Sequence, residues 1–381
     1  MGYTSDMQFS QPSAARQLNR LRTLNLVAKE RELSRADIAR LLGLSKVSTS
    51  EIVDQLIKEN LLTEAGIRPT DKGRPPINIT LNKDAAMVLA IDIGSRNISV
   101  GIVNLGGEIR RFERLPSPVK PSAEELAALI IQLSQKFLAR MKDPDLIKGL
   151  AISMAAEIEG ATGTILNHPQ WQYKDVPLSF ALKRHLRFPI LLENSVKSLI
   201  QGEFWFANLD AQTNYLYLNW SDHLETVFLS KGKMFPSVSL FDHMPTSGSK
   251  RCYCGLYGCL HTTASVKVLT EGTTLKNLLS QDHSPSLSHA AILMGQALVP
   301  AALALRPQKI IIGGPMSILP ERYYTELKQA FWQQATPLLT TEIERSSLGE
   351  QAGLLGTAAI ALDEFVFKRS VLEQLKGQRL A

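Results

Sequence analysis

The first sixty residues place apolar side chains at the spacing of α-helices. Apolar residues recur every three residues from Leu18 to Val27, among arginines. Two further helices are predicted on either side of Gly43. Ser34 and Asp37 form a capping-box-like pair at the start of the first, and Ser45 can cap the second. The apolar positions of these two helices are Ile38, Leu41 and Leu42, then Val47, Ile52, Val53, Leu56 and Ile57. A helix, a glycine-containing turn and a helix are the outline of a helix-turn-helix.

Two short extended segments follow, at residues 61–64 and 77–81, with the loop "AGIRPTDKGRPP" between them. This segment is typical of a hairpin with a basic loop, the wing of a winged helix-turn-helix. Its prolines and glycines also mark a domain boundary. We therefore expect a winged helix-turn-helix domain over residues 1–82.

From residue 87 onward the pattern is that of an α/β domain. "VLAIDIG", "ISVGIVN" and "EIRRFERL" predict three consecutive strands, followed by a helix over residues 122–141 and the strand "KGLAISMA". Later segments predict the strand "PILLEN", a helix over 196–207, the strands "NYLYLNW" and "TVFLS", and a buried strand in "PQKIIIGGP". Strands that first form a meander and then alternate with helices favour mixed sheets flanked by helices.

Composition narrows the class of protein. A chain of 381 residues with 44% hydrophobic and 20% charged residues predicts an ordinary globular protein of two or three domains. No apolar run approaches the roughly 18 residues of a membrane helix, and the first residues do not resemble a signal peptide. We therefore expect a cytoplasmic protein without membrane insertion. The net charge of +6 permits a polyanionic partner.

The helix-turn-helix pattern predicts a double-stranded DNA operator as the partner. The second helix of this motif enters the major groove with its N-terminal residues first. The expected DNA contacts are therefore Ser45, Lys46, Ser48, Thr49 and Ser50 on the helix, and Arg68, Lys72 and Arg74 in the wing. Because such motifs usually bind two symmetric half-sites, we expect a homodimer or tetramer. The alternative is a helical pair that binds protein.

All three cysteines lie in "RCYCGLYGC", as Cys252, Cys254 and Cys259. An odd number excludes a complete disulfide framework, and clustered thiols in a reducing compartment point to a metal. A structural zinc site takes four ligands, often three thiolates and one imidazole. The spacing leaves two candidates for the imidazole, His243 upstream and His261 downstream. The alternative is a group of reduced thiols without metal.

These residues carry a family resemblance. "CYCGLYGCL" resembles the C-x-C-G-x-x-G-C-L signature of the ROK family, which contains sugar kinases and transcriptional regulators. "AIDIGSRNISVGIVN", "LNHPQW", "LLENSVKS", "IIIGGP" and "GLLGTAAIA" are similar to further family segments, and the N-terminal region resembles the winged helix of the regulators. The resemblance implies two actin-like α/β lobes with a cleft between them, over residues 83–381. It also implies His243 as the fourth ligand of a structural zinc loop over residues 243–259.

The phosphate-transfer residues of the family are altered. The family places an aspartate after "EN", where this chain has Ser195, and a serine cannot accept the sugar proton near neutral pH. Ser95 and Arg96 replace the usual glycine and threonine after "DIG", although Asp92 and Gly94 remain. The second phosphate segment, "LNWSDHLETVFLS", contains no glycine. We therefore predict that the chain is not an enzyme; the alternative is a sugar kinase or sugar-binding enzyme with an accessory helical domain.

The sugar site of the family is altered as well. Asn167 and Asn194 are kept, but Ser195, Leu240 and His261 replace carboxylates. These changes predict few acceptors for sugar hydroxyls, and hence an altered, sugar-derived effector that is less hydroxylated or anionic. The candidate effector residues are Asn167, Asn194, Ser195 and His261, with Arg96 as a further partner for an anion.

The predicted function is a DNA-binding regulator, a repressor of carbohydrate-related genes. A third candidate is a zinc-stabilised module that responds to a protein partner rather than to a small molecule.

Overall fold

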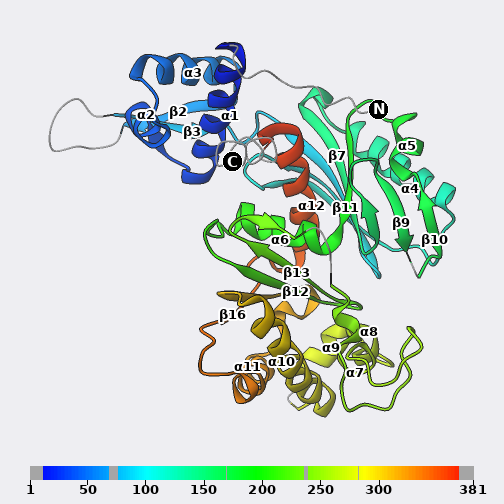
Figure 1. The fold of residues 1–381 in the computed structure, drawn as a ribbon. Helices are drawn as coiled ribbons and strands as arrows, with labels where there is room; N and C mark the ends of the chain where they lie inside the picture. The colour runs from blue at the N-terminus through cyan, green and yellow to red at the C-terminus, as the bar shows by residue number, and fades with distance from the viewer. Residues whose placement is uncertain (1–11, 68–75, 169, 236–238, 282, 369–381) are drawn as a thin grey trace, which may run out of the picture.

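The computed structural model describes residues 12–67, 76–168, 170–235, 239–281 and 283–368. Within them the chain forms three neighbouring parts: an N-terminal unit and two α/β lobes (Figure 1). Arg68, Lys72 and Arg74, the basic residues expected in the wing, lie outside the described residues.

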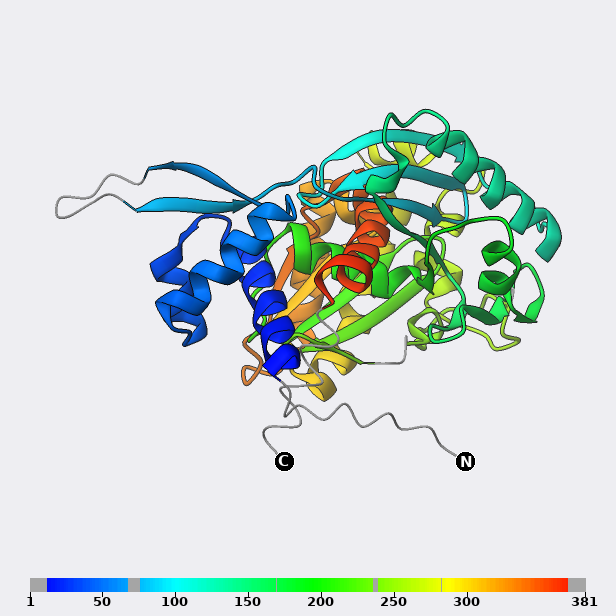
Figure 2. The same ribbon diagram turned by 90° about the horizontal axis from the view of Figure 1, so that it is seen from above.

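The N-terminal unit consists of three helices and a three-stranded antiparallel sheet. The helices are α1 (Pro12–Glu30), α2 (Arg35–Leu42) and α3 (Lys46–Lys58). The strands lie in the order β1 (Leu33–Ser34), β3 (Ile77–Leu81) and β2 (Leu62–Ile67). Strands β2 and β3 form the paired arm that extends away from the rest of the molecule in Figure 2.

Local signals fix the ends of α2 and the start of α3. Ser34 Oγ accepts the backbone N–H of Asp37, and the Asp37 carboxylate accepts the backbone N–H of Ser34, so the predicted capping box is confirmed. Gly43 ends α2 in the left-handed conformation, at φ 67°, which glycine adopts without steric cost. Ser45 then caps α3 by accepting the backbone N–H of Ser48. The predicted sequence of helix, glycine turn and helix is therefore present.

The buried face of α3 differs from the expectation. Thr49 is only 1% exposed and shares its face with Ile52, Val53 and Leu56, which follow three, four and seven residues later. Val47, predicted to lie on the apolar face, is 70% exposed. The prediction that Thr49 contacts DNA is therefore wrong, because the helical period turns its side chain into the core of the N-terminal unit.

Each lobe contains a five-stranded sheet, and the two sheets share one topology. The strand order in the first lobe is β6 (Ile109–Pro116), β5 (Asn97–Asn104), β4 (Met87–Ile93), β7 (Ile147–Met154) and β11 (Ile190–Asn194). In the second lobe it is β14 (Lys233–Met234), β13 (Leu224–Ser230), β12 (Tyr215–Trp220), β15 (Lys309–Gly313) and β16 (Glu342–Arg345). Both sheets pair an antiparallel meander of three strands with two parallel strands. The predicted mixed α/β fold is confirmed, and every strand expected from the sequence is present.

Helices cover the outer faces of the two sheets, and short elements join them. The first lobe carries α4 (Ala123–Leu138), α5 (Leu178–Lys183) and a small sheet of β8 (Glu157–Glu159), β9 (Thr164–His168) and β10 (Tyr173–Val176), which the sequence analysis missed. The second lobe carries α7 (His261–Ala264), α8 (Val266–Leu269), α9 (Leu275–Leu279), α10 (Pro285–Leu305) and α11 (Glu321–Gln334). The single-turn elements are η1 (Pro144–Leu146), η2 (Phe241–His243), η3 (Pro315–Ile318) and η4 (Gly349–Gln351).

Two helices, α6 (Ser195–Phe206) and α12 (Ala352–Leu362), pack against each other between the lobes (Figure 1). Helix α12 lies on β4 and β7 of the first sheet, and α6 contacts β12 and β13 of the second. The helices approach closely at Gly356, where an added Cβ atom would lie 2.5 Å from the carbonyl oxygen of Ser198. Glycine at this position therefore lets the two lobes share one tight helix–helix contact.

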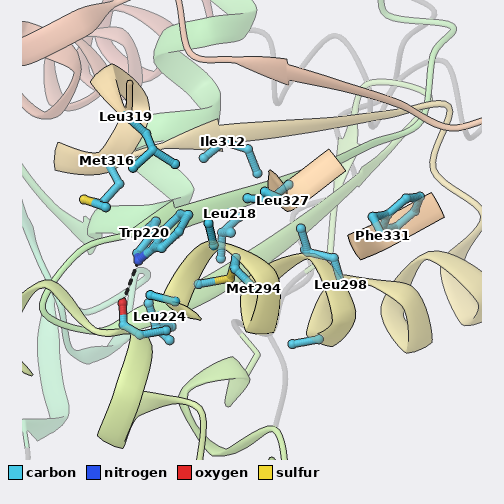
Figure 3. Packing of buried hydrophobic residues seen from close by; sticks show 14 of the residues in the cluster. Leu218, Trp220, Leu224, Met294, Leu298, Ile312, Met316, Leu319, Leu327 and Phe331 are labelled. Carbon is cyan, nitrogen blue, oxygen red and sulfur yellow. Dashed lines mark hydrogen bonds between the residues drawn. The ribbon is translucent and has the colours of Figure 1, made fainter. Parts of the chain in front are cut away.

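The second lobe is built on a core centred on Trp220, which Figure 3 shows from close by. The Trp220 indole N–H donates to the carbonyl oxygen of Ala264 at 2.7 Å, so the buried ring keeps its hydrogen bond. Met294 and Leu298 of α10 pack into the same core. Among the described residues, α10 is the one helix long and apolar enough to cross a membrane, and this packing accounts for its apolar character.

The N-terminal unit and the first lobe share a continuous apolar core. Its buried side chains run from Leu24 and Val27 of α1 through Leu362 of α12 to Phe367, in the π-helical turn η5 (Asp363–Phe367). The Phe367 ring is fully buried and lies 4.5 Å from the Trp205 ring, measured between centroids. The Asn25 side-chain amide donates to the carbonyl oxygen of Phe367 at 2.9 Å. Helix α1 is thus attached to η5, the turn that continues α12, by both packing and a hydrogen bond.

Replacing Phe367 with alanine should leave a cavity in this shared core. We expect Phe367→Ala to lower the free energy of unfolding by about 3–5 kcal/mol, measured by urea denaturation. Phe180→Ala is the matched control, because Phe180 is 69% exposed and its loss should change the free energy by less than about 0.5 kcal/mol. Equal effects of the two substitutions would show that Phe367 does not join the two parts.

Candidate functional site

The cleft between the lobes contains two cavities that meet at Ala155 and His223. The larger has a volume of about 880 Å³ and is lined from β9, α6, β13 and α7, among other elements. The smaller has a volume of about 430 Å³ and lies between the β4–β5 turn, Gly314 and the start of α12. Asn167, Asn194 and His261, three of the expected effector residues, line the larger cavity, whereas Ser195 lines the smaller one.

The smaller cavity contains Asp92, the half-buried aspartate of the segment that resembles the first phosphate motif. Asp92 Oδ1 accepts a hydrogen bond from Ser153 Oγ at 2.8 Å. Burial raises the pKa of Asp92 to about 6. The backbone of Gly353 packs directly on this carboxylate, since an added Cβ atom there would lie 2.1 Å from Asp92 Oδ2. The start of α12 is therefore in contact with the floor of the cleft.

A salt bridge crosses the mouth of this cavity from one lobe to the other. Arg96, in the β4–β5 turn, donates from Nε and Nη2 to the two carboxylate oxygens of Asp222 at 3.0 and 2.8 Å. Ser95 Oγ also donates to Asp222, at 2.6 Å, and Arg96 Nη2 donates to Thr270 Oγ1 at 2.7 Å. The Arg96 guanidinium is therefore paired with a carboxylate, and the expectation that it serves an anionic effector is not supported.

Polar groups of the larger cavity include carboxylates that the sequence analysis missed. Glu157, Glu225 and Asp242 all line it. Glu225 Oε2 is buried and has no hydrogen-bond partner among the described residues, and burial raises the pKa of this carboxyl. The expectation of few acceptors is therefore wrong, because carboxylates at other positions line the cavity. The lone Glu225 within the apolar run "LETVFLS" is the signal that could have revealed one of them.

The two expected asparagines differ in what they can still bind. Asn194 is buried; its side chain donates to the carbonyl oxygen of Ala156 at 3.0 Å and accepts the backbone N–H of Val196 at 2.8 Å. Both ends of that amide are therefore engaged in holding β11 and α6. Asn167, on β9, borders the same cavity from the opposite lobe to His261.

Asp242 lies at the centre of a hydrogen-bond network in the larger cavity. Its Oδ2 atom lies 2.9 Å from His223 Nδ1 and accepts from the Tyr253 hydroxyl at 2.8 Å. Its Oδ1 atom lies 3.2 Å from His261 Nδ1 and accepts the backbone N–H of Leu224 at 2.7 Å. Burial opposes ionisation, but the hydrogen bonds from His223 and His261 outweigh it and hold the pKa of Asp242 well below its usual value.

The three cysteines and His243 form a compact cluster beside this cavity. The ligand atoms of His243, Cys252, Cys254 and Cys259 all lie within 4.8 Å of one another. The distance from Cys252 Sγ to His243 Nδ1 is 3.6 Å, and that from Cys254 Sγ to Cys259 Sγ is 3.7 Å. His261, the other candidate, is turned to Asp242 instead. The cluster could hold one metal ion with four protein ligands.

Backbone geometry explains why glycines occupy the cysteine loop. Gly258 adopts φ 71°, and an added Cβ atom there would lie 2.4 Å from the carbonyl oxygen of Gly248. The backbone N–H of Cys252 donates to the Leu256 carbonyl at 2.7 Å, which closes the turn between the first and last cysteines. The loop is therefore held in shape by its own hydrogen bonds as well as by any bound ion.

The predicted DNA-contacting residues on α3 divide into two groups. Ser45, Lys46 and Ser48 are exposed at the first turn, although Ser45 Oγ is also used to cap the helix. Ser50 is half-buried and Thr49 is buried. The exposed surface at the start of α3 therefore consists of Lys46 with Ser45 and Ser48, next to the exposed Val47.

The comparisons with known proteins identify relatives along nearly the whole chain. The model of the ROK family matches residues 88–364. The xylose repressor of Caldicellulosiruptor bescii is 25% identical, with 92% of this chain and 97% of that protein covered. The DNA-binding transcriptional repressor Mlc of Escherichia coli is 24% identical, with 91% and 93% covered.

Two solved structures resemble the fold. A ROK family transcriptional regulator, described as a homologue of Escherichia coli Mlc, has a TM-score of 0.72 at 20% identity and covers 94% of this chain and 99% of its own. A ROK family glucokinase from Streptomyces griseus has a TM-score of 0.62 at 19% identity and covers 72% of this chain and 99% of its own.

The interlobe salt bridge should contribute measurable stability. We expect a double-mutant cycle of Arg96→Gln and Asp222→Asn to give a coupling energy of about 1–2 kcal/mol in urea unfolding, because Asp222 is buried and hydrogen-bonded. The exposed pair of Arg110 and Asp84 is the control, with an expected coupling below about 1 kcal/mol. If the coupling energy between Arg96 and Asp222 is no larger than that of the control pair, the salt bridge does not help to hold the two lobes together.

His168 should make stability fall in mild acid. The ring is buried and stacks on Trp171 with centroids 4.4 Å apart; burial lowers its pKa from 6.5 to about 4. Between these pH values the unfolded chain takes up the proton and the folded chain does not, so stability is lost as pH falls, by up to about 3 kcal/mol.

We expect His168→Gln to flatten the dependence of unfolding free energy on pH between 6.5 and 4, measured by urea denaturation at several pH values. His185→Gln, at an exposed position, should leave the slope as in the wild type. A slope that survives in His168→Gln would place the acid sensitivity on another group.

Proposed function

The chain belongs to the ROK family, and we propose that it is a transcriptional repressor of carbohydrate-related genes, with a winged helix-turn-helix that binds a DNA operator. The observation that carries this function is the extent of the similarity. The repressors match more than nine-tenths of the chain, whereas the glucokinase leaves more than a quarter unmatched. The family model begins at residue 88, after the N-terminal unit. The similarity to the repressors therefore extends over more of the chain than the family model or the glucokinase does, and repressors bind DNA through a unit of this kind in our proposal.

In this proposal α3 is the recognition helix and the β2–β3 hairpin is the wing. The N-terminal turn of a recognition helix approaches base edges and phosphates, where a lysine and small hydroxyl side chains are suitable donors. Lys46, Ser48 and the partly exposed Ser50 meet this description. Arg68, Lys72 and Arg74 remain candidates for wing contacts. A homodimer or tetramer would present two such helices to symmetric half-sites.

The cleft supports a regulator better than a kinase. Ser195 stands where the family has its proton-accepting aspartate, and a hydroxyl does not act as a base near neutral pH. The side chains of Ser95, Arg96 and Asp222 meet across the mouth of the smaller cavity. The phosphates of a nucleoside triphosphate would lie near the negatively charged carboxylate of Asp222 instead of near backbone amides, and the like charges would repel.

The larger cavity suits a small, sugar-derived effector. Asn167, Glu157 and Glu225 offer acceptors to hydroxyl groups, and His261 adds an imidazole. Ser195 faces the adjoining smaller cavity, where it can contact a ligand that extends toward the β4–β5 turn. Xylose and glucose are the first probes to use, since the relatives described above include a xylose repressor and a glucokinase. We infer that such an effector acts in the cytoplasm, where the thiols stay reduced.

We infer that the cysteine cluster binds a structural zinc ion. With Zn–S bonds of about 2.3 Å and Zn–N bonds of about 2.0–2.1 Å, tetrahedral geometry separates two sulfurs by about 3.8 Å and a sulfur from a nitrogen by about 3.6 Å. The separations of 3.7 and 3.6 Å in the cluster fit these values. Zinc would cross-link the loop to His243, and four protein ligands would leave no position for a reacting water.

Selection of bound duplexes from a random-sequence pool tests the proposed function. The full-length protein should enrich one operator, with two related half-sites if it binds as a dimer or tetramer. Failure to enrich any sequence at moderate salt would contradict a repressor.

On the selected operator, Lys46→Ala should weaken binding and reduce the slope of log affinity against log salt by about 1, because one phosphate contact is lost. Fluorescence anisotropy at several salt concentrations measures both quantities. Lys276→Ala, at an exposed position in the second lobe, should bind as the wild type does. An unchanged slope in Lys46→Ala would remove the first turn of α3 from the interface.

Cys254→Ser should lower the zinc content and the melting temperature, because three ligands hold the ion less tightly than four. Mass-spectrometric metal analysis of dialysed protein measures the first, and thermal unfolding the second. Ser249→Ala, at an exposed position of the same loop, is the matched control. Full zinc occupancy in Cys254→Ser would show that the ligands are misassigned.

A further inference from the structure

A second group of ligating side chains lies in the larger cavity, next to the cysteine cluster but separate from it. His223 follows β12, Asp242 lies in the turn η2, and His261 begins α7. One ligand atom from each of the three lies within 4.8 Å of the others. We propose that His223, Asp242 and His261 bind one divalent transition-metal ion in addition to the ion at the cysteines. This site does not depend on the proposed DNA-binding function.

The distances from Asp242 to the two histidines fit a shared ion. Bonds of about 2.0–2.2 Å from a metal to imidazole nitrogen and carboxylate oxygen separate neighbouring ligand atoms by about 2.9 Å at a right angle and about 3.4 Å at the tetrahedral angle. The two Asp242 oxygens lie 2.9 Å from His223 Nδ1 and 3.2 Å from His261 Nδ1. In the metal-free protein, hydrogen bonds from the two Nδ1–H groups occupy the same space.

Binding of the ion requires each ring in its neutral form. Each imidazole only has to carry its proton on Nε2 instead of Nδ1, so that Nδ1 becomes a ligand. His223 Nε2 lies 2.6 Å from the Gln170 side-chain amide, whose oxygen can accept that proton after the amide rotates. Partners of this kind fix the tautomer of metal-bound histidines in proteins.

The surroundings hold the ligands in place. Asp242 is fixed by the backbone N–H of Leu224 at 2.7 Å and by the Tyr253 hydroxyl at 2.8 Å, neither of which is a ligand. The two imidazole rings are nearly parallel, with an interplanar angle of 23° and centroids 5.7 Å apart. The Asp242 carboxylate is thus held between the His223 and His261 rings before any ion binds.

The position of the group leaves room for a further ligand. All three side chains line the cavity of about 880 Å³, so an ion bound there has an open side for water or for an oxygen of a cavity ligand. Glu225, two residues after His223, has a buried carboxylate oxygen that lacks a donor among the described residues. A cation bound in the same cavity would stabilise the ionised form of this carboxyl.

The ligand set selects the kind of metal. Two imidazoles and one carboxylate suit zinc, cobalt, nickel or copper rather than magnesium or calcium, which prefer oxygen ligands alone. The cysteine cluster, with three sulfurs, is the softer site and should fill first with zinc or cobalt. The two sites are therefore distinguishable by both order of filling and spectrum.

Titration of the metal-stripped, reduced full-length protein with cobalt(II) tests the proposal. The first equivalent should produce the strong near-ultraviolet absorption of cobalt–thiolate bonds. The second should bind more weakly and add only weak visible bands of nitrogen and oxygen coordination. Calorimetry on the same samples gives the number of ions per chain, with two expected for the wild type.

The variants His223→Gln and His261→Asn should each bind one cobalt ion, with the thiolate absorption unchanged, which also shows that they fold. His289→Gln, on the exposed surface of α10, should bind two. Tyr253→Phe should weaken the second ion by about tenfold, as loss of a supporting hydrogen bond does elsewhere. Saturation of the wild type at one equivalent, or two equivalents in both histidine variants, would overturn the second site.

Discussion

The attachment of the N-terminal unit to the first lobe is the constraint on which the rest of the structure depends. Phe367 and Leu362 join the same apolar core as Leu24 and Val27 of α1, so the N-terminal unit is not a separate domain on a loose linker. At its other end α12 reaches the cleft, where Gly353 packs on Asp92. Helix α12 contacts the cleft, and the π-helical turn η5 that continues it contacts α1, which gives a physical route between the cleft and the N-terminal unit.

The cleft lies in a fold similar to that of a ROK family glucokinase, and many of its polar side chains bond to one another. In the smaller cavity, a salt bridge between Arg96 and Asp222 joins the two lobes near the half-buried Asp92. In the larger cavity, Asp242 forms hydrogen bonds with two histidines and a tyrosine. The salt bridge and the Asp242 network favour a cleft that binds a small molecule over one that transfers phosphate. This agrees with the repressors that this chain resembles.

Local signals in the sequence predicted the caps of α2 and α3 and eight of the ten strands of the two large sheets, all but β14 and β16, because each depends on a few neighbouring residues. Predictions that depend on packing between distant parts of the chain were wrong or were not made. Thr49 is buried and Val47 exposed, since the packing of α3 and not polarity alone decides which face turns inward. Asp222 and Asp242 gain their roles from residues more than a hundred positions away or on other elements, such as Arg96 and Tyr253. No local pattern could reveal those partners.

Hydrogen exchange of the full-length protein, free and bound to its selected operator, tests most directly whether α12 connects the cleft to the N-terminal unit. If the N-terminal unit and the cleft form one body through α12, operator binding should slow amide exchange in α12 and in the β4–β5 turn, as well as in α3. Protection confined to the first 82 residues would show that the two parts act independently and would contradict the account.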